Sequence, residues 1–231
     1  MVSKLISIEE AVDQIRDGIR LMVGGFGGIG TPVSLIDRIL QKGLQDLTLI
    51  GNDAGFADQG VGRLISQERV KRLLTTHIGS NPDAGRQMME GKLEVLFYPQ
   101  GILAEKIRAG GVGLPAILVE PDVGIGPSQQ EQLVRYAGKN YVIEPALTAD
   151  VGIVYAKQAD TYGNLIYEKA ARNINPLVAM AGKITIAEVE EILPAGELNP
   201  EHIVTPGVFV NYIVRTSGGM GEWGFRSISE I

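Results

Sequence analysis

The sequence predicts an α/β fold: an open, mainly parallel mixed sheet with helices on both faces. Short apolar segments alternate with amphipathic ones along the first half of the chain, which is the pattern of parallel strands joined by helices. Glycine contributes 30 of the 231 residues, well above the average share of about 7%. Many tight turns and close backbone contacts are therefore expected.

Strands of the first half are expected at 19–24, 46–51, 70–77 and 93–98, where short apolar segments occur. Capping residues and glycines mark the helices between them. The expected helices are 7–17, opened by the Ser7/Glu10 capping box; 32–42, capped by Thr31, begun by Pro32 and stopped by Gly43; 82–90, capped by Asn81 and stopped by Gly91; and 101–109, stopped by Gly110 and Gly111.

The second half has longer extended segments and fewer helical ones. We predict a hairpin over 133–144 turning at Gly138-Lys139, two strands over 149–168 turning at Gly163-Asn164, a helix over 176–182, and strands over 183–189 and 208–214. No linker or repeat interrupts the pattern. We therefore expect a single domain over 1–231, with a core at about 4–214 and a tail at 215–231 that is mobile or docked on a partner.

Composition and charge exclude several classes of protein. The formal charge is −6 and no basic cluster occurs, so nucleic acid is not an expected partner. The chain has no cysteine and two histidines, which argues against a metal site. No apolar stretch is long enough to cross a bilayer and no targeting peptide is evident, so we expect a cytoplasmic protein without membrane contact.

The segment GGFGGIG, between a strand and a helix, is the most conspicuous motif. Its glycines fit G-x-G-x-x-G, the fingerprint of a dinucleotide-binding turn, and Asp53 follows the next strand, where a ribose ligand would lie. Because the helix begins only at Thr31-Pro32, the loop is expected to be longer and looser than that turn. Two other interpretations stay open: a loop needed only for close packing, or a bare backbone surface with free N–H groups for an extended ligand such as a pantetheine arm. The candidate ligand-binding residues are Gly24, Gly25, Phe26, Gly27, Gly28, Ile29 and Gly30.

Several spaced blocks of the chain together resemble one known family. The segment DGIRLMVGGFGGIGTP, residues 17–32, closely resembles the signature of the α subunit of family I coenzyme A transferases. The blocks LTLIGNDAG, HIGSNPDAGRQM and GKLEVLFYPQGILAEKIRAGGVGLPA follow in the family's order, and the resemblance extends over about residues 4–214. HIGSNP is closest to the acetate/acetoacetate type, whereas AMAGKITIAEVEEI is more similar to the succinyl-CoA:3-oxoacid type.

The resemblance implies half of an enzyme that transfers CoA between a short-chain acyl-CoA and an acid such as acetate, butyrate, acetoacetate or succinate. In the family a glutamate attacks the acyl-CoA and then carries CoA as a glutamyl thioester. That glutamate lies in an SENG motif of the β subunit, which is absent from this sequence. The resemblance thus implies a β-subunit partner in an α2β2 assembly, with CoA and acyl-CoA as substrates and no permanently bound cofactor.

Gln100, in YPQG, is the candidate catalytic residue of this chain. It follows a predicted strand and begins a helix, at the sheet edge where α/β proteins bind ligands. The resemblance implies that its side-chain amide donates to the reacting acyl oxygen and stabilises the developing charge. The plainer alternative is that Gln100 only caps its helix. For the whole chain, the competing functions are a nicotinamide-dependent oxidoreductase and a non-catalytic supporting subunit.

Other polar residues are interpreted more simply. Arg172-Asn173 could face the site or the β subunit, but the simpler interpretation of Asn173 is an asparagine before a turn. A solvent-facing surface is expected for Glu188, Glu190 and Glu191. The phosphate groups of CoA require positive charge, which either the partner chain supplies or this chain does, with Lys71, Arg72 and Arg108 as the candidates.

Overall fold

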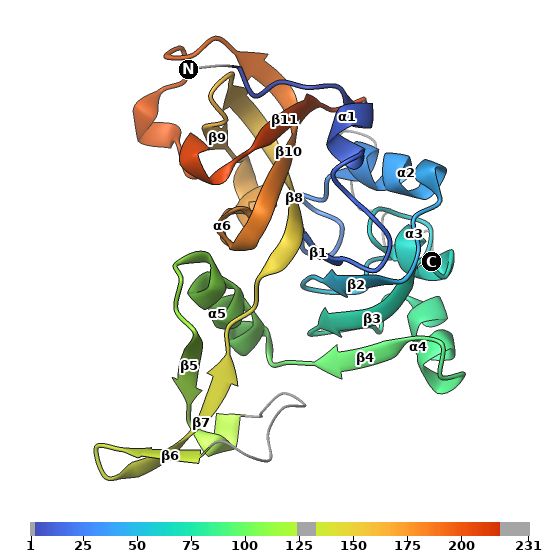
Figure 1. The fold of residues 1–231 in the computed structure, drawn as a ribbon, viewed down its shortest axis with the longest axis vertical. Helices are drawn as coiled ribbons and strands as arrows, with labels where there is room; N and C mark the ends of the chain where they lie inside the picture. The colour runs from blue at the N-terminus through green and yellow to red at the C-terminus, as the bar shows by residue number, and fades with distance from the viewer. Residues whose placement is uncertain (1–2, 124–132, 218–231) are drawn as a thin grey trace.

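The computed structural model describes residues 3–123 and 133–217, and a large sheet forms its centre (Figure 1). The strand order is β11-β10-β8-β1-β2-β3-β4, and all pairings along this path are parallel. The short strand β9 pairs antiparallel with β8, so the sheet is mixed, as predicted. The strands are β1 (Arg20–Val23), β2 (Leu47–Ile50), β3 (Val70–Thr75), β4 (Glu94–Phe97), β8 (Ala149–Asp160), β9 (Leu165–Ile166), β10 (Gly182–Leu193) and β11 (Tyr212–Arg215).

Helices cover both faces of this sheet, which confirms the predicted fold class. Helices α1 to α4 pack on one face, and α5 and α6 on the other (Figure 1). The helices are α1 (Ile8–Val12), α2 (Val33–Lys42), α3 (Gly62–Ser66), α4 (Pro82–Met89), α5 (Gln100–Gly111) and α6 (Asn175–Ala181).

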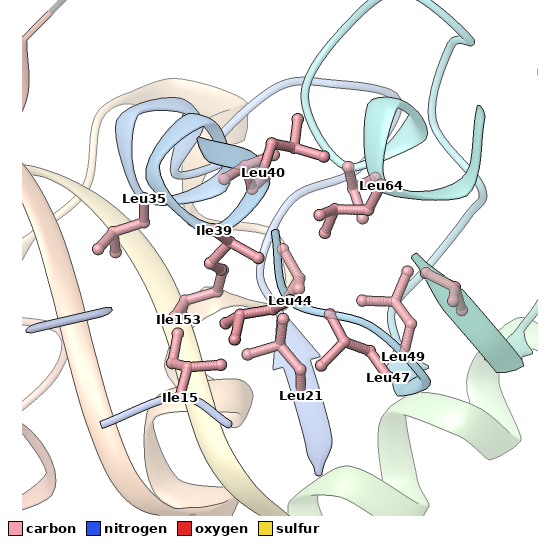
Figure 2. Packing of buried hydrophobic residues seen from close by; sticks show 14 of the residues in the cluster. Ile15, Leu21, Leu35, Ile39, Leu40, Leu44, Leu47, Leu49, Leu64 and Ile153 are labelled. Atoms are coloured by element: carbon pink, nitrogen blue, oxygen red, sulfur yellow. The ribbon is translucent and has the colours of Figure 1, made fainter. Parts of the chain in front are cut away.

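The hydrophobic core is divided by the sheet, because alternate residues of a strand point to opposite faces. Leu21 and Val23 of β1 pack with α1 to α4, whereas Met22 packs with α5 and α6. Figure 2 shows the first of these clusters, where α2 turns its apolar face, with Leu35 and Ile39, toward the sheet. Full burial of such a side chain contributes about 1.5–3 kcal/mol, so both layers of helices are held firmly on the strands.

The chain leaves the middle of the sheet in two directions. Strands β2 to β4 follow β1 on one side, and β8, β10 and β11 lie on the other. The connection after β1 runs through α2 on one face, and the connection after β8 runs through α6 on the opposite face. Open α/β sheets bind ligands at such a switch point, outside the carboxyl ends of the strands. The loops after β1 and β8 are therefore where a site is expected.

Several predicted helix ends are confirmed and others are wrong. Asn81 caps α4 by accepting two backbone N–H groups, and Gly43 and Gly91 follow α2 and α4 with φ of 74° and 70°. Helix α1 ends at Val12, well short of the predicted end. The strand expected at 208–214 begins only at Tyr212, because a 3₁₀ turn precedes it.

Gly110 and Gly111, predicted to follow the helix and stop it, are instead the last two residues of α5, and Val112 is its C-cap. A Cβ on Gly110 would lie 2.0 Å from the carbonyl oxygen of Leu147, and one on Gly111 would lie 2.6 Å from Cβ of Met180 in α6. These two glycines therefore allow α5 to approach its neighbours closely. Their role is packing rather than termination.

A second sheet projects from the main body, where one sheet had been expected (Figure 1). It is antiparallel, with the order β5-β7-β6, and its β6–β7 pair is the predicted hairpin. A buried ion pair between Lys106 of α5 and Glu144 of β7 joins it to the main body. Beyond Ser217, the predicted tail lies outside the described residues. The strands are β5 (Ala116–Val119), β6 (Leu133–Tyr136) and β7 (Lys139–Pro145).

Candidate functional site

The loop after β1 forms a tight turn at the carboxyl edge of the sheet. Phe26 and Ile29 exchange both of their backbone hydrogen bonds, each with an N···O distance of 3.0 Å. Between them Gly27 and Gly28 have φ of 55° and 88°, and two successive positive φ values are typical of a type I′ turn. The loop is therefore a small hairpin, not the loose segment that its length suggested.

The glycines of this segment have two different roles. A Cβ on Gly24, Gly25 or Gly30 would lie 1.8, 2.3 or 2.6 Å, respectively, from a neighbouring atom, so these three are required for packing. A Cβ on Gly27 or Gly28 would meet no atom within 4 Å. The packing interpretation thus accounts for the base of the turn, and open space lies over its tip.

Two side chains from other parts of the chain hold the turn. Asp53, after β2, accepts the N–H of Gly27 through Oδ2 at 2.8 Å. Asn173, in the segment before α6, accepts the N–H of Gly25 through Oδ1 at 3.2 Å. Its Nδ2 donates to the carbonyl oxygen of Ile29 at 2.9 Å. The tip and the base of the turn are therefore fixed separately.

Asn175, the first residue of α6, supports the same segment from below the surface. Its fully buried side chain accepts the N–H of Tyr155 at 3.1 Å and donates to the carbonyl oxygens of Gly30 and Ala171 at 2.9 and 2.8 Å. The sequence pattern did not predict this role of Asn175, and it offered Asn173 either as a residue that faces the site or the β subunit or, more simply, as a residue before a turn. The two asparagines, spaced i, i+2 where a loop meets a helix, are the signal that could have revealed it.

Helix α2, which follows the turn, is capped by a distant carboxylate. The predicted cap at Thr31 is wrong: Pro32 occupies the N-cap position and forms no side-chain cap. Instead the carboxylate of Glu188, on β10, accepts the N–H groups of Ser34 and Leu35 at 3.1 and 2.9 Å. Proline at the cap position leaves these donors without a local partner, and Glu188 supplies one.

Glu188 is buried, contrary to the expectation of a solvent-facing surface. Its side chain is 1% exposed, also accepts the hydroxyl of Thr216 at 2.7 Å, and has a pKa raised by burial. Glu190 is partly buried and pairs with Lys157. Among the three glutamates only Glu191 is exposed as predicted. A carboxylate at a helix N-terminus is favoured by the helix dipole, which helps to offset the burial of its charge.

These contacts argue against a dinucleotide-binding turn. In that motif the pyrophosphate binds the N-terminus of the helix that follows the glycines, but here the carboxylate of Glu188 occupies that position. Asp53, at the position expected for a ribose-binding acid, instead uses both carboxylate oxygens to accept backbone N–H groups, from Gly27 and Gly55. The sequence matches the dinucleotide fingerprint, but the helix N-terminus and the acid that would bind the dinucleotide form hydrogen bonds within the protein instead.

The backbone N–H groups of the turn are also mostly engaged, so the expectation that they are free for a ligand is largely wrong. Within the part of the chain that the structure describes, Gly28 and Gly30 keep N–H groups without a hydrogen-bond partner. The N–H groups already bonded are those of Gly24, Gly25, Phe26, Gly27 and Ile29.

A small hollow lies beside the turn, where the ends of β1 and β2 meet. At its rim the side chain of Phe26 is 50% exposed. The bare backbone, the free N–H of Gly28 and the exposed ring of Phe26 suit a thin ligand with apolar segments. The hollow is lined by Val23, Gly24, Gly25, Phe26, Gly28, Thr31, Gly51, Asn52, Asp53 and Val61.

Gln100 is the first residue of α5 and follows β4 at the same edge of the sheet, as predicted. Its side chain is exposed and forms no hydrogen bond with any described residue. Because Pro99 is the N-cap of α5 and no side chain caps this helix, the interpretation of Gln100 as a helix cap is wrong. The turn lining the hollow and Gln100 share an edge, but strands β2 and β3 lie between them.

The cations proposed from the sequence do not gather at this edge. Lys71 and Arg72 lie near the amino end of β3, and Arg72 pairs with Glu94 at 2.7 Å. Arg108 is in the last turn of α5, where it pairs with Glu105. None of the three lies where it could contact a ligand bound at the turn formed by residues 24–30, called the glycine turn below.

Neither a metal cluster nor a membrane-spanning helix occurs in the described part of the chain. Among residues 3–123 and 133–217, no group of three His, Asp or Glu side chains could hold a metal ion. In the same residues, no helix has the length and hydropathy needed to cross a membrane.

Comparison with known proteins places this arrangement in a family. The family model described as coenzyme A transferase matches residues 5–216. The chain belongs to the coenzyme A transferase family. Across 96% of its length it is 56% identical to the alpha subunit of a probable coenzyme A transferase of Bacillus subtilis, of which it covers 98%.

Two further relatives of this transferase chain have different named substrates. It is 45% identical to the alpha subunit of the acetate CoA-transferase of Escherichia coli, over 93% of this chain and 97% of the relative. It is 47% identical to the corresponding chain of a probable succinyl-CoA:3-ketoacid coenzyme A transferase of B. subtilis, over 91% and 88% of the two chains. Because these relatives are named as subunits, a partner chain in a hetero-oligomer is implied.

Among solved structures, an acyl-CoA transferase of E. coli O157:H7 has the same fold. It matches 93% of this chain with a TM-score of 0.79 and 25% identity. The transferase chain described here spans only 47% of that protein's length. The E. coli O157:H7 protein is therefore about twice as long as the part of it that shares this fold with the present chain.

Proposed function

We propose that this chain is the α subunit of a CoA-transferase that moves CoA between a short-chain acyl-CoA and a carboxylic acid. The observation that carries the proposal is its end-to-end similarity, at 45–56% identity, to subunits named for CoA transfer. The glycine turn, with open space over its tip, supports it. We assign it a β-subunit partner in an α2β2 assembly in the cytoplasm, with CoA and acyl-CoA as substrates and no resident cofactor.

The proposed chemistry requires a nucleophile from the partner. One of its glutamate carboxylates attacks the acyl carbonyl of acyl-CoA. The C–S bond breaks, CoA departs as a thiolate, and an acyl-glutamyl anhydride forms on the partner. The thiolate then attacks the glutamyl carbonyl and expels the acyl group as a free carboxylate. The acceptor acid reverses both steps on the glutamyl thioester, so that one difficult exchange becomes several easier ones.

Gln100 is assigned the role of an oxyanion donor in these steps. Each attack converts a carbonyl oxygen into a developing oxyanion, which a neutral amide stabilises without adding charge to the ground state. An exposed side chain with no partner among the described residues is free to donate in this way. Tyr98, two residues before Gln100, has its ring centroid 4.6 Å from Nζ of Lys106, which is buried against Glu144, so the segment that leads into α5 is held against the helix.

The glycine turn is assigned to the pantetheine arm of CoA. Three strand spacings separate β1 from β4, and at about 4.8 Å each they place the turn roughly 14 Å from the start of α5. An extended arm spans a distance of this order, with its thioester at Gln100 and its amides along the turn. The N–H of Gly28 and the exposed ring of Phe26 are the contacts available to it.

We propose short acids and 3-oxo acids as the substrate class. The chain is almost equally similar to an acetate enzyme and to a succinyl-CoA:3-ketoacid enzyme, at 45% and 47% identity. Small carboxylates with and without a 3-oxo group are therefore the acceptors to test first.

The decisive experiment is reconstitution with the partner subunit. The isolated chain should show no transferase activity, and the assembled complex should transfer CoA to one or more of acetate, butyrate, acetoacetate and succinate. Appreciable turnover by the isolated chain, or none by the complex on the whole panel, contradicts the proposal. If variants of the glycine turn and Gln100 leave turnover of the complex intact, the chain only supports its partner. Thermal stabilisation by NADH but not by CoA would restore the oxidoreductase alternative.

A further inference from the structure

Asn173 has a backbone conformation that is unfavourable for asparagine. Its φ of 21° and ψ of −120° lie in a region that residues with a Cβ avoid and that is least costly for glycine. Conformations of this kind persist where the surrounding structure enforces them, and they concentrate at functional sites. The backbone alone would be better served by glycine, so the side chain must account for the asparagine.

The side chain of Asn173 joins both ends of the glycine turn to its own segment. Its Oδ1 accepts the N–H groups of Gly25 and Ile174 at 3.2 and 2.7 Å. Its Nδ2 donates to the carbonyl oxygens of Ile29 and Ala170, each at 2.9 Å. The carbonyl of Ile29 is the same group that accepts the N–H of Phe26 and so closes the turn. One amide therefore fixes the turn at its entry and its exit.

The turn requires such a restraint because its base consists of glycines. Gly25 and Gly30 have φ of 119° and 75°, and glycine has the widest choice of backbone conformations. Without Asn173 the Gly25 N–H and the Ile29 carbonyl lose these contacts, and a ligand would have to supply part of the order of the turn on binding. A preorganised turn spares the ligand that cost.

We infer that Asn173 is the positioning residue of the CoA site: its side-chain amide holds the glycine turn in its binding conformation, and the strained backbone is tolerated to place that amide. The inference rests on the proposed function, because it assumes that CoA lies on this turn. Asn173 acts through the turn, so it affects affinity for CoA rather than the chemical step.

The test is Asn173→Gly in the complex with the partner subunit. Glycine tolerates this backbone better than any residue with a Cβ, so relief of strain offsets part of the stability lost with the side-chain hydrogen bonds, and the melting temperature should fall only slightly. Loss of two ordering hydrogen bonds should raise the KM for acyl-CoA about tenfold, while kcat at saturation changes little. Asn173→Asp keeps the bond to Gly25 but loses the donor to Ile29, so it should also raise KM.

The matched control is Asn199→Gly, which removes an exposed asparagine whose side chain accepts one backbone N–H, that of Glu201, in another turn. Its KM should equal that of the wild type. An unchanged KM for Asn173→Gly, with or without a lower melting temperature, would overturn the inference and leave Asn173 a structural role. If wild-type complex neither binds CoA by calorimetry nor transfers it, the proposed function fails instead.

Discussion

Replacing Gly28 by alanine tests whether the glycine turn is a ligand surface. Gly28 has φ of 88°, and a Cβ there would meet no atom within 4 Å. The cost to folding is therefore only that of a left-handed backbone, about 1–2 kcal/mol for a residue with a Cβ. For a chain of this size that corresponds to a fall of about 2–8 °C in melting temperature, which leaves the protein folded and assayable.

A matched control exists in the projecting sheet. Gly138, in the β6–β7 turn, has φ of 83° and likewise open space at its Cβ position. Gly138→Ala therefore introduces the same strain away from the hollow. We expect Gly28→Ala to raise the KM for acyl-CoA at least tenfold, equivalent to about 1.4 kcal/mol, because the new methyl takes space that the ligand uses. Gly138→Ala should leave KM unchanged.

The assay is acyl-CoA saturation kinetics of the assembled complex, with calorimetric titration of CoA and melting temperatures on the same preparations. Equal KM values for the two variants, at equal loss of stability, would refute the assignment of the turn to CoA. A larger fall in melting temperature for Gly28→Ala would show that the space over the turn is filled by protein in the complex.

Three further predictions concern other parts of the chain. Gln100→Ala should lower kcat by roughly a hundred- to a thousandfold with little change in KM or melting temperature, as steady-state kinetics and calorimetry can show; a stability loss with normal kcat would return it to a structural role. Glu188→Ala leaves two buried N–H groups at the start of α2 unpaired, at about 1–3 kcal/mol each, so thermal unfolding should begin several degrees lower; an unchanged unfolding curve would contradict the cap. The Lys183 side chain, followed by the Arg20 N–H, lowers the pKa of Asp150, so its stabilisation is present above the ordinary aspartate pKa and is lost as pH falls through the lowered value. Asp150→Asn should therefore flatten the acid limb of stability against pH in urea titrations, and an unaltered slope would count against it.

Local signals in the sequence predicted much of the fold. Alternating apolar segments located the parallel strands, and Asn81 and Gly43 marked helix ends correctly because capping depends on neighbouring residues. Gly110 and Gly111 misled for a physical reason. A glycine that ends a helix and a glycine that lets a neighbouring segment pack closely look alike in the sequence. Only the atoms packed against the glycine in the structure distinguish the two roles.

The site was predicted less completely, because its supporting contacts join distant segments. Gln100 was placed correctly, since a residue between a strand and a helix must lie at the sheet edge. The burial of Glu188 was not predicted, because its alternation with apolar residues is typical of a half-exposed strand. Its buried partner is the N-terminus of α2, where Pro32, 156 positions earlier in the chain, provides no side-chain cap. No window of sequence contains both halves of that interaction.

The long separations of these contacts determine when the site is completed during synthesis. The bond between Asn173 and Gly25 spans 148 residues, that between Glu188 and Ser34 spans 154, and that between Ser217 and Ser34 spans 183. By contrast the Asp53 contact to the turn spans 26. A nascent chain that has already formed β1 to β4 thus carries a turn held at its tip alone. Contacts between residues so far apart in the sequence form late, and the N-terminal end of a domain emerges first during synthesis. A fragment released early from the ribosome therefore retains the glycine motif but lacks Asn173 and Glu188, which hold the turn and the start of α2.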